Sequence, residues 1–203
     1  MIDIEKIVVK VDNMVVIDKL SLEIDKGDKV LIKAPSGKGK TTFFRALLGF
    51  VPLESGEIKI DGLDLCEKNM RKIRDKISYI SQGVELPSGN VKDVVKEIFN
   101  YKRNRDRELN TEEAKKKFVE FGLDKNIFEK QMENLSGGER QRLAIIILVL
   151  LDRDIWLLDE VTASLDLELK LLIERYILES DKTVLLISHD THWHTENFKE
   201  VTW

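Results

Sequence analysis

The sequence predicts an α/β fold in which helices alternate with the strands of a mainly parallel sheet. Two short runs, residues 154–158 and 183–187, are almost entirely apolar, which is typical of strands buried on both faces. A third β-type run, residues 29–33, leads through a glycine-containing loop into a helical pattern. Strands that alternate with helices form parallel sheets, because a parallel connection requires a crossover.

The composition describes one globular chain of 203 residues, with 42% hydrophobic and 34% charged residues. This length suits one substantial core and is short for two ordinary domains. The net charge of −4 gives no reason to expect a nucleic acid as partner. Cys66 is the single cysteine, so an internal disulfide is excluded.

The chain shows no membrane span and no export signal. Its first residues are charged, without an apolar signal core. The longest apolar run, residues 143–151, covers less than half of a membrane. We therefore expect a protein that neither crosses a membrane nor is exported by a visible signal.

The first third of the chain predicts a small antiparallel sheet beside the main one. Turn residues at 12–13 and 25–28 separate short β-type runs, and a further strand is expected at 56–60 before a turn. The β-type runs before the glycine-containing loop are residues 7–9, 15–17 and 20–24.

Residues 34–42, between the strand at 29–33 and a helix expected from Phe43, have the pattern of a phosphate-binding loop. Successive backbone N–H groups of such a loop form an anion nest, and the helix start adds positive charge. Gly39 allows the backbone to approach the phosphate, Lys40 supplies a positive charge, and Thr41 supplies a hydroxyl for Mg²⁺. An ordinary turn rich in glycine and lysine is the alternative for this loop taken alone.

The middle of the chain predicts a strand followed by helix. Residues 76–82 form a β-type run that ends in the amide of Gln82. From 91 to 121 the pattern becomes helical, and Asn90 is a suitable N-cap. The charged run 102–117 is expected to be a solvated loop and helix surface, with an interaction tail as the alternative.

A second helix start with anion-binding character follows. Ser136 and Glu139 have the spacing of a capping box, so a helix should begin there. The Ser136 hydroxyl and the amides of Gly137 and Gly138 would form a second anion site. Farther on, polar groups follow both buried strands: Asp159 with Glu160 after the first, and His189 after the second, with an amphipathic helix at 166–179 between these two strands.

Taken together, these motifs resemble the ATP-binding subunit of ABC transporters over essentially the whole chain. Residues 135–139, Leu-Ser-Gly-Gly-Glu, are similar to the signature that is most specific to that family, and residues 158–160 are similar to its Walker B strand end. The resemblance implies a P-loop NTPase (RecA-like) fold. In that fold 1–83 and 136–203 would form the ATP-binding core with a small antiparallel β-subdomain, and 84–135 a helical subdomain, within one ABC ATPase domain.

The resemblance also implies roles for individual residues. Mg²⁺ would be held by Thr41, Gln82 and Asp159, partly through water. Glu160 resembles the catalytic glutamate that deprotonates the attacking water, and His189 the switch histidine on the γ-phosphate. Gln82, Lys40, Glu160 and His189 are the expected catalytic group. The ATP phosphates would be bound by the loop residues Ser36, Gly37, Lys38, Gly39, Lys40, Thr41 and Thr42.

A second subunit is implied as well. In the family, the signature turn faces the ATP held by the partner, so Ser136, Gly137 and Gly138 would contact the partner's nucleotide. Each ATP would lie between the Lys40 loop of one chain and Ser136 of the other, in a head-to-tail dimer that we expect to be a homodimer. Residues 163–166 resemble the D-loop at that interface. The family usually stacks adenine on an aromatic residue, but at the corresponding place, near Val11, there is none.

The function expected from this resemblance is an ATP-hydrolysing motor that drives separate transmembrane permease subunits from the cytoplasmic face of the membrane. Residues 79–94 resemble the corresponding region of export-type members, and among these the compact ATPases linked to metal or iron export. The alternatives are a soluble ABC ATPase of iron–sulfur cluster assembly and a DNA- or ribosome-associated ABC machine. The short stretch between Gln82 and Ser136 leaves no room for the long coiled coils of DNA-repair members.

Overall fold

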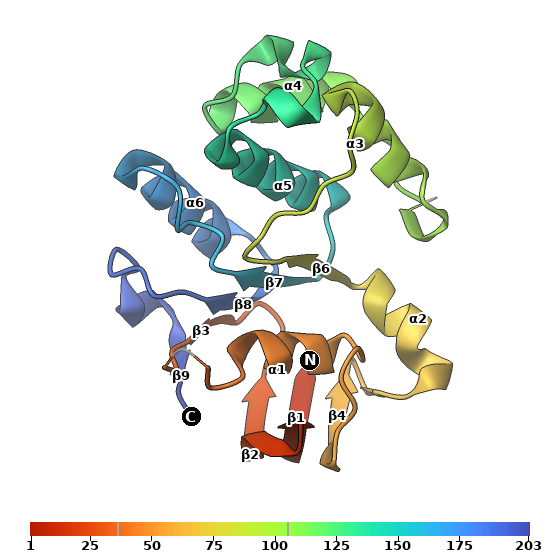
Figure 1. Ribbon diagram of the computed structural model, residues 1–203, viewed down its shortest axis with the longest axis vertical. Coiled ribbons are helices and arrows are strands. Elements are labelled where there is room, and N and C mark those ends of the chain that lie inside the picture. Colours follow the sequence, from red (N-terminus) through yellow and green to blue (C-terminus); the bar gives the residue numbers. More distant parts are fainter. Residues whose placement is uncertain (36, 105) are drawn as a thin grey trace.

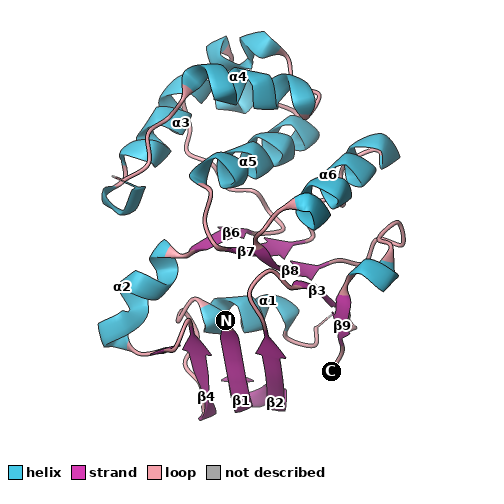
Figure 2. Cartoon of the chain, turned by 180° about the vertical axis from the view of Figure 1, so that it is seen from behind, coloured by secondary structure: helices cyan, strands magenta, loops and turns pink. Residues whose placement is uncertain are grey.

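The computed structural model of the chain describes residues 1–35, 37–104 and 106–203. Ser36, one of the predicted phosphate-binding residues, lies outside the described residues. The described chain forms layers: a group of helices, a parallel sheet, a single helix and an antiparallel sheet (Figure 1). Seen from behind, the same order of layers is evident (Figure 2).

The parallel sheet lies at the centre of the molecule. Every neighbouring pair within it is parallel, as the alternation of strands and helices predicts. Four of its strands were expected from the sequence, and the short edge strand β9 was not. The order across the sheet is β6 (Ile77–Ile80), β7 (Ile155–Asp159), β8 (Thr183–Ile187), β3 (Lys29–Ile32) and β9 (Lys199–Val201).

Both faces of this sheet are buried, which explains why its strands are apolar without alternation. Successive side chains of a strand point to opposite faces. Ile155 and Leu157 belong to the core shared with α1 (Lys40–Leu47) and the antiparallel sheet, whereas Trp156 and Leu158 belong to the core under the helices. Two separate cores therefore share one sheet.

The predicted antiparallel sheet is present. Its order is β2 (Met14–Ile24), β1 (Ile2–Val11), β4 (Ser55–Ile60) and β5 (Leu63–Asp64). The three short runs expected before the loop are two long strands joined by a hairpin. Asp12 and Asn13 form its turn with φ of 48° and 63°, the left-handed geometry that a tight hairpin requires.

The remaining helices lie mostly on the other face of the parallel sheet. Within the described residues, α2 follows the antiparallel sheet, and the sequence did not suggest it. The helices are α2 (Glu67–Asp75), α3 (Val91–Asn100), α4 (Thr111–Glu120), α5 (Gly137–Leu151) and α6 (Leu167–Glu179), with 3-10 turns η1 (Lys102–Asn104), η2 (Lys125–Glu129), η3 (Met132–Asn134) and η4 (Thr195–Asn197). In the described chain no helix is both long and apolar enough to cross a membrane.

The helical pattern over 91–121 is two helices separated by a loop, in agreement with the loop and helix surface expected over 102–117. The Asn90 cap is present, with its side chain accepting from the Lys92 amide at 3.0 Å. The helix ends at Asn100, and its C-cap Tyr101 has a ψ of 139°, outside the helical range. A new helix starts after Asn110, whose side chain caps the amides of Glu112 and Glu113. A second capping residue inside the pattern restarts the helix, because its side chain replaces the backbone acceptor.

Candidate functional site

The predicted site residues follow the carboxyl ends of four adjacent strands. Gln82 follows β6, Glu160 follows β7, His189 follows β8 and the phosphate loop with Lys40 follows β3. Because these strands are parallel neighbours, their carboxyl ends meet at one edge of the sheet. Residues that are far apart in the sequence are thereby brought into contact.

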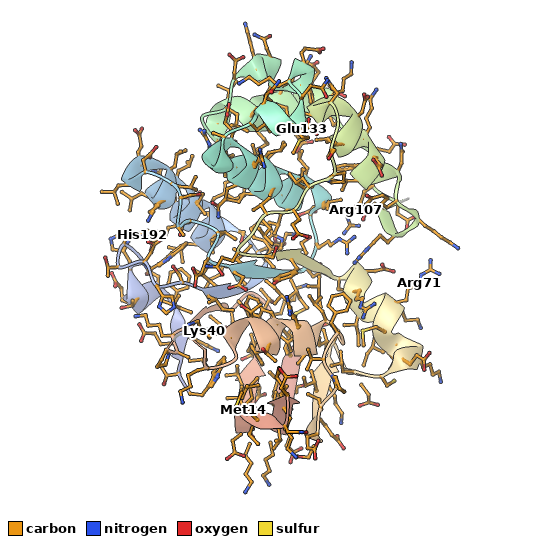
Figure 3. All side chains as sticks on the ribbon, in the orientation of Figure 1. Met14, Lys40, Arg71, Arg107, Glu133 and His192 are labelled. Atoms are coloured by element: carbon orange, nitrogen blue, oxygen red, sulfur yellow. The ribbon has the colours of Figure 1, made fainter. Side chains whose placement is uncertain are left out.

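Lys40 is a buried cation at the start of α1 (Figure 3). The residue is 8% exposed, and its Nζ donates to the carbonyl of Ala34 at 2.6 Å. The same Nζ lies 2.9 Å from Nε2 of His189. Because the ammonium can only donate, His189 accepts at Nε2 and carries its proton on Nδ1. No salt bridge to Lys40 occurs among the described residues.

Gly39 is required at its position for two reasons. Its φ is 79°, a left-handed conformation that strains residues with a Cβ. A Cβ built on it would lie 3.1 Å from the carbonyl oxygen of Val16 on β2. From the sequence, Gly39 is explained by the approach of the backbone to phosphate. The structure adds a second reason, the close packing of the loop against Val16.

Thr41 and Asp159, two of the three predicted magnesium ligands, are in contact. Thr41 Oγ1 donates to Oδ2 of Asp159 at 2.7 Å. Asp159 is 2% exposed. Burial raises the pKa of its carboxyl, and the hydrogen bond from Thr41 opposes this shift. Two oxygen ligands of the kind that Mg²⁺ prefers therefore lie side by side.

Glu160 contacts two of the residues predicted to act with it. Nε2 of Gln82 donates to its Oε2 at 2.9 Å, and Nε2 of His189 lies 3.8 Å from its Oε1. No hydrogen bond among the described residues joins Gln82 to Thr41 or Asp159, the other predicted magnesium ligands. Glu160 has a φ of 52°, which is rare for a residue with a side chain and is held only by strong surroundings.

Gln141 and Trp203 of this region were missed in the sequence, and Ser164 was expected only as part of the D-loop at the dimer interface. Gln141 on α5 is 6% exposed, and its Nε2 donates to the carbonyl of Glu160 at 3.3 Å. Its Oε1 accepts a hydrogen bond from the hydroxyl of Ser164. Trp203 donates from Nε1 to the carbonyl of Lys38 at 2.8 Å and packs its ring edge on Phe43. Only Gln141 could have been found from the sequence. It is the fifth residue of a helix that is otherwise mostly apolar, and a buried amide in such a helix needs hydrogen-bond partners.

The second helix start has the predicted local geometry. Ser136 Oγ accepts from the amide of Glu139 at 3.2 Å, and Oε2 of Glu139 accepts from the Ser136 amide at 2.8 Å. This is the reciprocal capping box expected from the spacing. Among the described residues, however, no hydrogen bond or salt bridge joins 136–138 to the loop at 34–42. The two predicted anion sites are therefore separate within one chain.

The donor set fits a nucleotide phosphate and a magnesium ion. A buried ammonium without a carboxylate partner is stabilised by an anion, and the first turn of α1 contains no acidic residue that would repel one. Gly37 and Gly39 both have left-handed φ values, 78° and 79°, as in a loop that turns its amides inward. For the magnesium ion, the relevant group is the buried Asp159 carboxylate. Among the described residues it has no cationic partner in a salt bridge, so a divalent cation can compensate its charge.

Comparisons with known proteins agree with this geometry. Residues 17–163 match the sequence profile of the family described as ABC transporter. The chain is 33% identical over 185 residues to the energy-coupling factor transporter ATP-binding protein EcfA1 of Mycoplasmopsis synoviae, covering 86% of this chain and 67% of that protein. It is 35% identical over 181 residues to the ATP-dependent lipid A-core flippase of Pectobacterium atrosepticum, covering 84% of this chain but only 30% of the flippase.

A solved structure gives the same result for the fold. The dimeric structure of a post-hydrolysis state of an ATP-binding cassette, bound to ADP and Pi, superimposes with a TM-score of 0.76 at 25% identity. The match covers 94% of this chain and 88% of that one. The predictions of a P-loop NTPase fold and of an ATPase motor of the transporter type are confirmed, and the comparisons do not support the alternatives in iron–sulfur assembly, DNA repair or the ribosome. The chain belongs to the ABC transporter family, as one of its ATP-binding ATPase domains.

Proposed function

We propose that two copies of this chain close head to tail around two Mg-ATP and drive transmembrane permease subunits from the cytoplasmic face of a membrane. The observation that carries this proposal is the assembly of Lys40, Asp159, Glu160, Gln82 and His189 at one sheet edge. The Ser136 turn, which also suits an anion, has no hydrogen bond or salt bridge to the Lys40 loop among the described residues. A second copy would bring such a turn to the site.

Each side chain then has a defined task. Bound Mg²⁺ would supply charge neutralisation on the phosphates, held by Thr41 and Asp159. Lys40 exchanges its loop carbonyl contacts for phosphate oxygens. The Glu160 carboxylate, held by Gln82, orients the attacking water and accepts its proton. His189, placed between Lys40 and Glu160, is free to contact the terminal phosphate once it has released Lys40. Donation from Nε2 to the phosphate requires a ring proton on Nε2, where the lysine ammonium now donates.

The membrane partner and the direction of transport are also proposals. The flippase relative supports an export-type motor, whereas the energy-coupling factor relative is named only as a transporter component. We expect the permease to dock near residues 83–95. A hollow of about 240 Å³ borders the start of this segment, between β6, α5 and the end of α3, and its lining includes Val84 and Leu86. Export of a metal or iron remains a prediction from the sequence.

The decisive experiment combines ATP hydrolysis with sizing of the Glu160→Gln variant. The substitution keeps the hydrogen-bonding shape but removes the base, so we expect turnover to fall by at least about 100-fold. ATP binding should persist, and the variant should accumulate as an ATP-bound dimer. Glu129→Gln is the matched control, because Glu129 is an exposed carboxylate in η2, outside the proposed site. This variant should behave as wild type. Undiminished turnover in Glu160→Gln, or a monomer at saturating Mg-ATP, would contradict the proposal.

A further inference from the structure

Gln141 connects three segments that the proposed mechanism treats separately. It lies in the second turn of α5, the helix that begins at the Ser136 turn. Its amide nitrogen bonds to the carbonyl of Glu160, and its amide oxygen bonds to the hydroxyl of Ser164. A carbonyl can only accept a hydrogen bond, so the orientation of this amide is determined by its partners.

The bond to Glu160 acts on a strained residue. Glu160 has a φ of 52° and is held by few backbone contacts: its amide donates to Ile187 at 2.9 Å, and its carbonyl accepts from the Ala163 amide at 3.3 Å. Gln141 adds a side-chain donor to the same carbonyl. A backbone in a sparsely populated conformation persists only where its surroundings over-determine it, and Gln141 is one of these constraints.

The helix that carries Gln141 is anchored at the Ser136 turn. The capping box between Ser136 and Glu139 fixes the first turn, and Lys130 adds a salt bridge to Glu139 at 2.9 Å. A Cβ at Gly138 would lie 3.7 Å from the carbonyl of Ser164, so the start of α5 packs closely against the segment that contains Ser164. Direct contacts therefore join the start of α5 to Gln141 and to the segment that contains Ser164.

We propose that Gln141 is a positioning residue that couples the two ATP sites of the dimer. This inference rests on the proposed function, in which the Ser136 turn faces the ATP of the partner while Glu160 acts on the ATP of its own chain. Closure of the turn on one nucleotide then sets, through Gln141, the position of the carboxylate that acts on the other nucleotide. Hydrolysis at each site depends in this way on occupancy of the other.

The first test replaces Gln141 by methionine, which keeps the volume and removes both hydrogen bonds. We expect turnover to fall about 10- to 100-fold, as for a misplaced catalytic group, with unchanged ATP affinity. The Hill coefficient of hydrolysis against ATP should fall toward 1. Ser164→Ala should show a smaller loss in the same direction, and Ser164→Thr, which keeps the hydroxyl, should restore most of it. Gln131→Met, at an exposed glutamine outside this network, is the matched control.

The second test needs no turnover. Hydrogen exchange of the nucleotide-free protein should become faster at residues 160–166 in Gln141→Met, because the constraint on Glu160 is lost. Residues 183–187 of the central strand β8 should keep their protection. Faster exchange in both segments would indicate a merely structural role and would overturn the proposal, as would wild-type turnover with an unchanged Hill coefficient.

The combined variant separates this inference from the proposed function. Gln141→Met added to Glu160→Gln should reduce residual turnover no further, because Gln141 acts through Glu160. A further large reduction would show that Gln141 acts by another route. If Glu160→Gln alone retains turnover, the proposed function fails whatever Gln141 does.

Discussion

Glu160 and Lys40 both occupy energetically unfavourable positions, one through its backbone conformation and the other through burial of its charge. Glu160 occupies a left-handed backbone conformation at the end of β7, and Lys40 is a buried cation bonded to carbonyl groups and a histidine. Such positions cost free energy, and they persist at sites where strain or charge is used in the mechanism. The binding of phosphate is expected to offset the cost at Lys40.

At the same scale, Gly39→Ala tests the packing of the phosphate loop against β2. We expect a loss of about 1–2 kcal/mol in the free energy of unfolding from the left-handed φ alone. A further loss is expected from the approach to Val16, measured by urea denaturation.

Gly62→Ala is the matched control for that measurement. Its φ of 72° is similar, but a Cβ there would meet nothing within 4 Å. The difference between the two variants therefore isolates the Val16 contact. Equal losses in both variants would show that the phosphate loop shifts to accommodate the added Cβ, so that the contact with Val16 does not destabilise the fold.

Among the elements, α5 combines a fixed start with an apolar body. Its capping box and the Lys130 salt bridge hold the Ser136 turn in place before any nucleotide binds. The rest of the helix is buried around most of its circumference, with Leu143, Ile146 and Leu148 in the core. A helix fixed at both its start and its body is the kind of rigid element that the proposed coupling through Gln141 requires.

The capping box also predicts how stability depends on pH. The hydrogen bond from the Ser136 amide, with help from Lys130, lowers the pKa of Glu139 from 4.5 to about 2. Since the folded-state pKa is the lower one, this stabilisation is fully present above pH 4.5 and is lost as the pH falls toward about 2.

Glu139→Gln keeps an acceptor for the Ser136 amide but does not titrate. We therefore expect the stability difference between wild type and Glu139→Gln to shrink on acidification between about pH 5 and pH 2. Urea denaturation at a series of pH values measures it. A difference that stays constant across this range would mean that the carboxylate is not stabilised in the folded chain.

For the whole molecule, the separation of the two anion sites predicts complementation between inactive variants. Lys40→Ala removes the loop cation, and Ser136→Arg blocks the signature turn, so each variant alone should be inactive. In a head-to-tail mixed dimer, one site combines the intact loop of one chain with the intact turn of the other.

Equal mixing should therefore restore at most about a quarter of wild-type turnover, because half of the randomly formed dimers are mixed and each contains one intact site. The proposed coupling through Gln141 lowers the value further, since the second site of a mixed dimer is defective. ATP hydrolysis across a range of mixing ratios measures this, with a maximum expected at equal amounts. If the complete site lay within one chain, no mixture would exceed its separate components.

The sequence by itself determined those segments that depend only on residues close together in the chain. The buried strands β7 and β8 follow from short apolar runs, the phosphate loop from its glycines and lysine, and the start of α5 from the Ser136–Glu139 spacing. These depend on neighbours a few residues away, through burial of a continuous apolar run, backbone freedom and reciprocal capping. A loop and a helix were expected over 102–117, but the start of α4 was not located, because its cap, Asn110, lies inside a pattern that appears helical.

Only the tertiary structure decided which groups meet. The hydrogen bonds from Thr41 to Asp159, from Gln82 to Glu160 and from Gln141 to Glu160 join residues on different elements. Their contact depends on the order of strands in the parallel sheet, which no local pattern encodes. The same holds for Trp203, which reaches Lys38 only because β9 pairs with β3 at the sheet edge. The local sequence identifies the site side chains, but long-range strand pairing determines which of them lie side by side. The order of strands in a sheet depends on packing over the whole core.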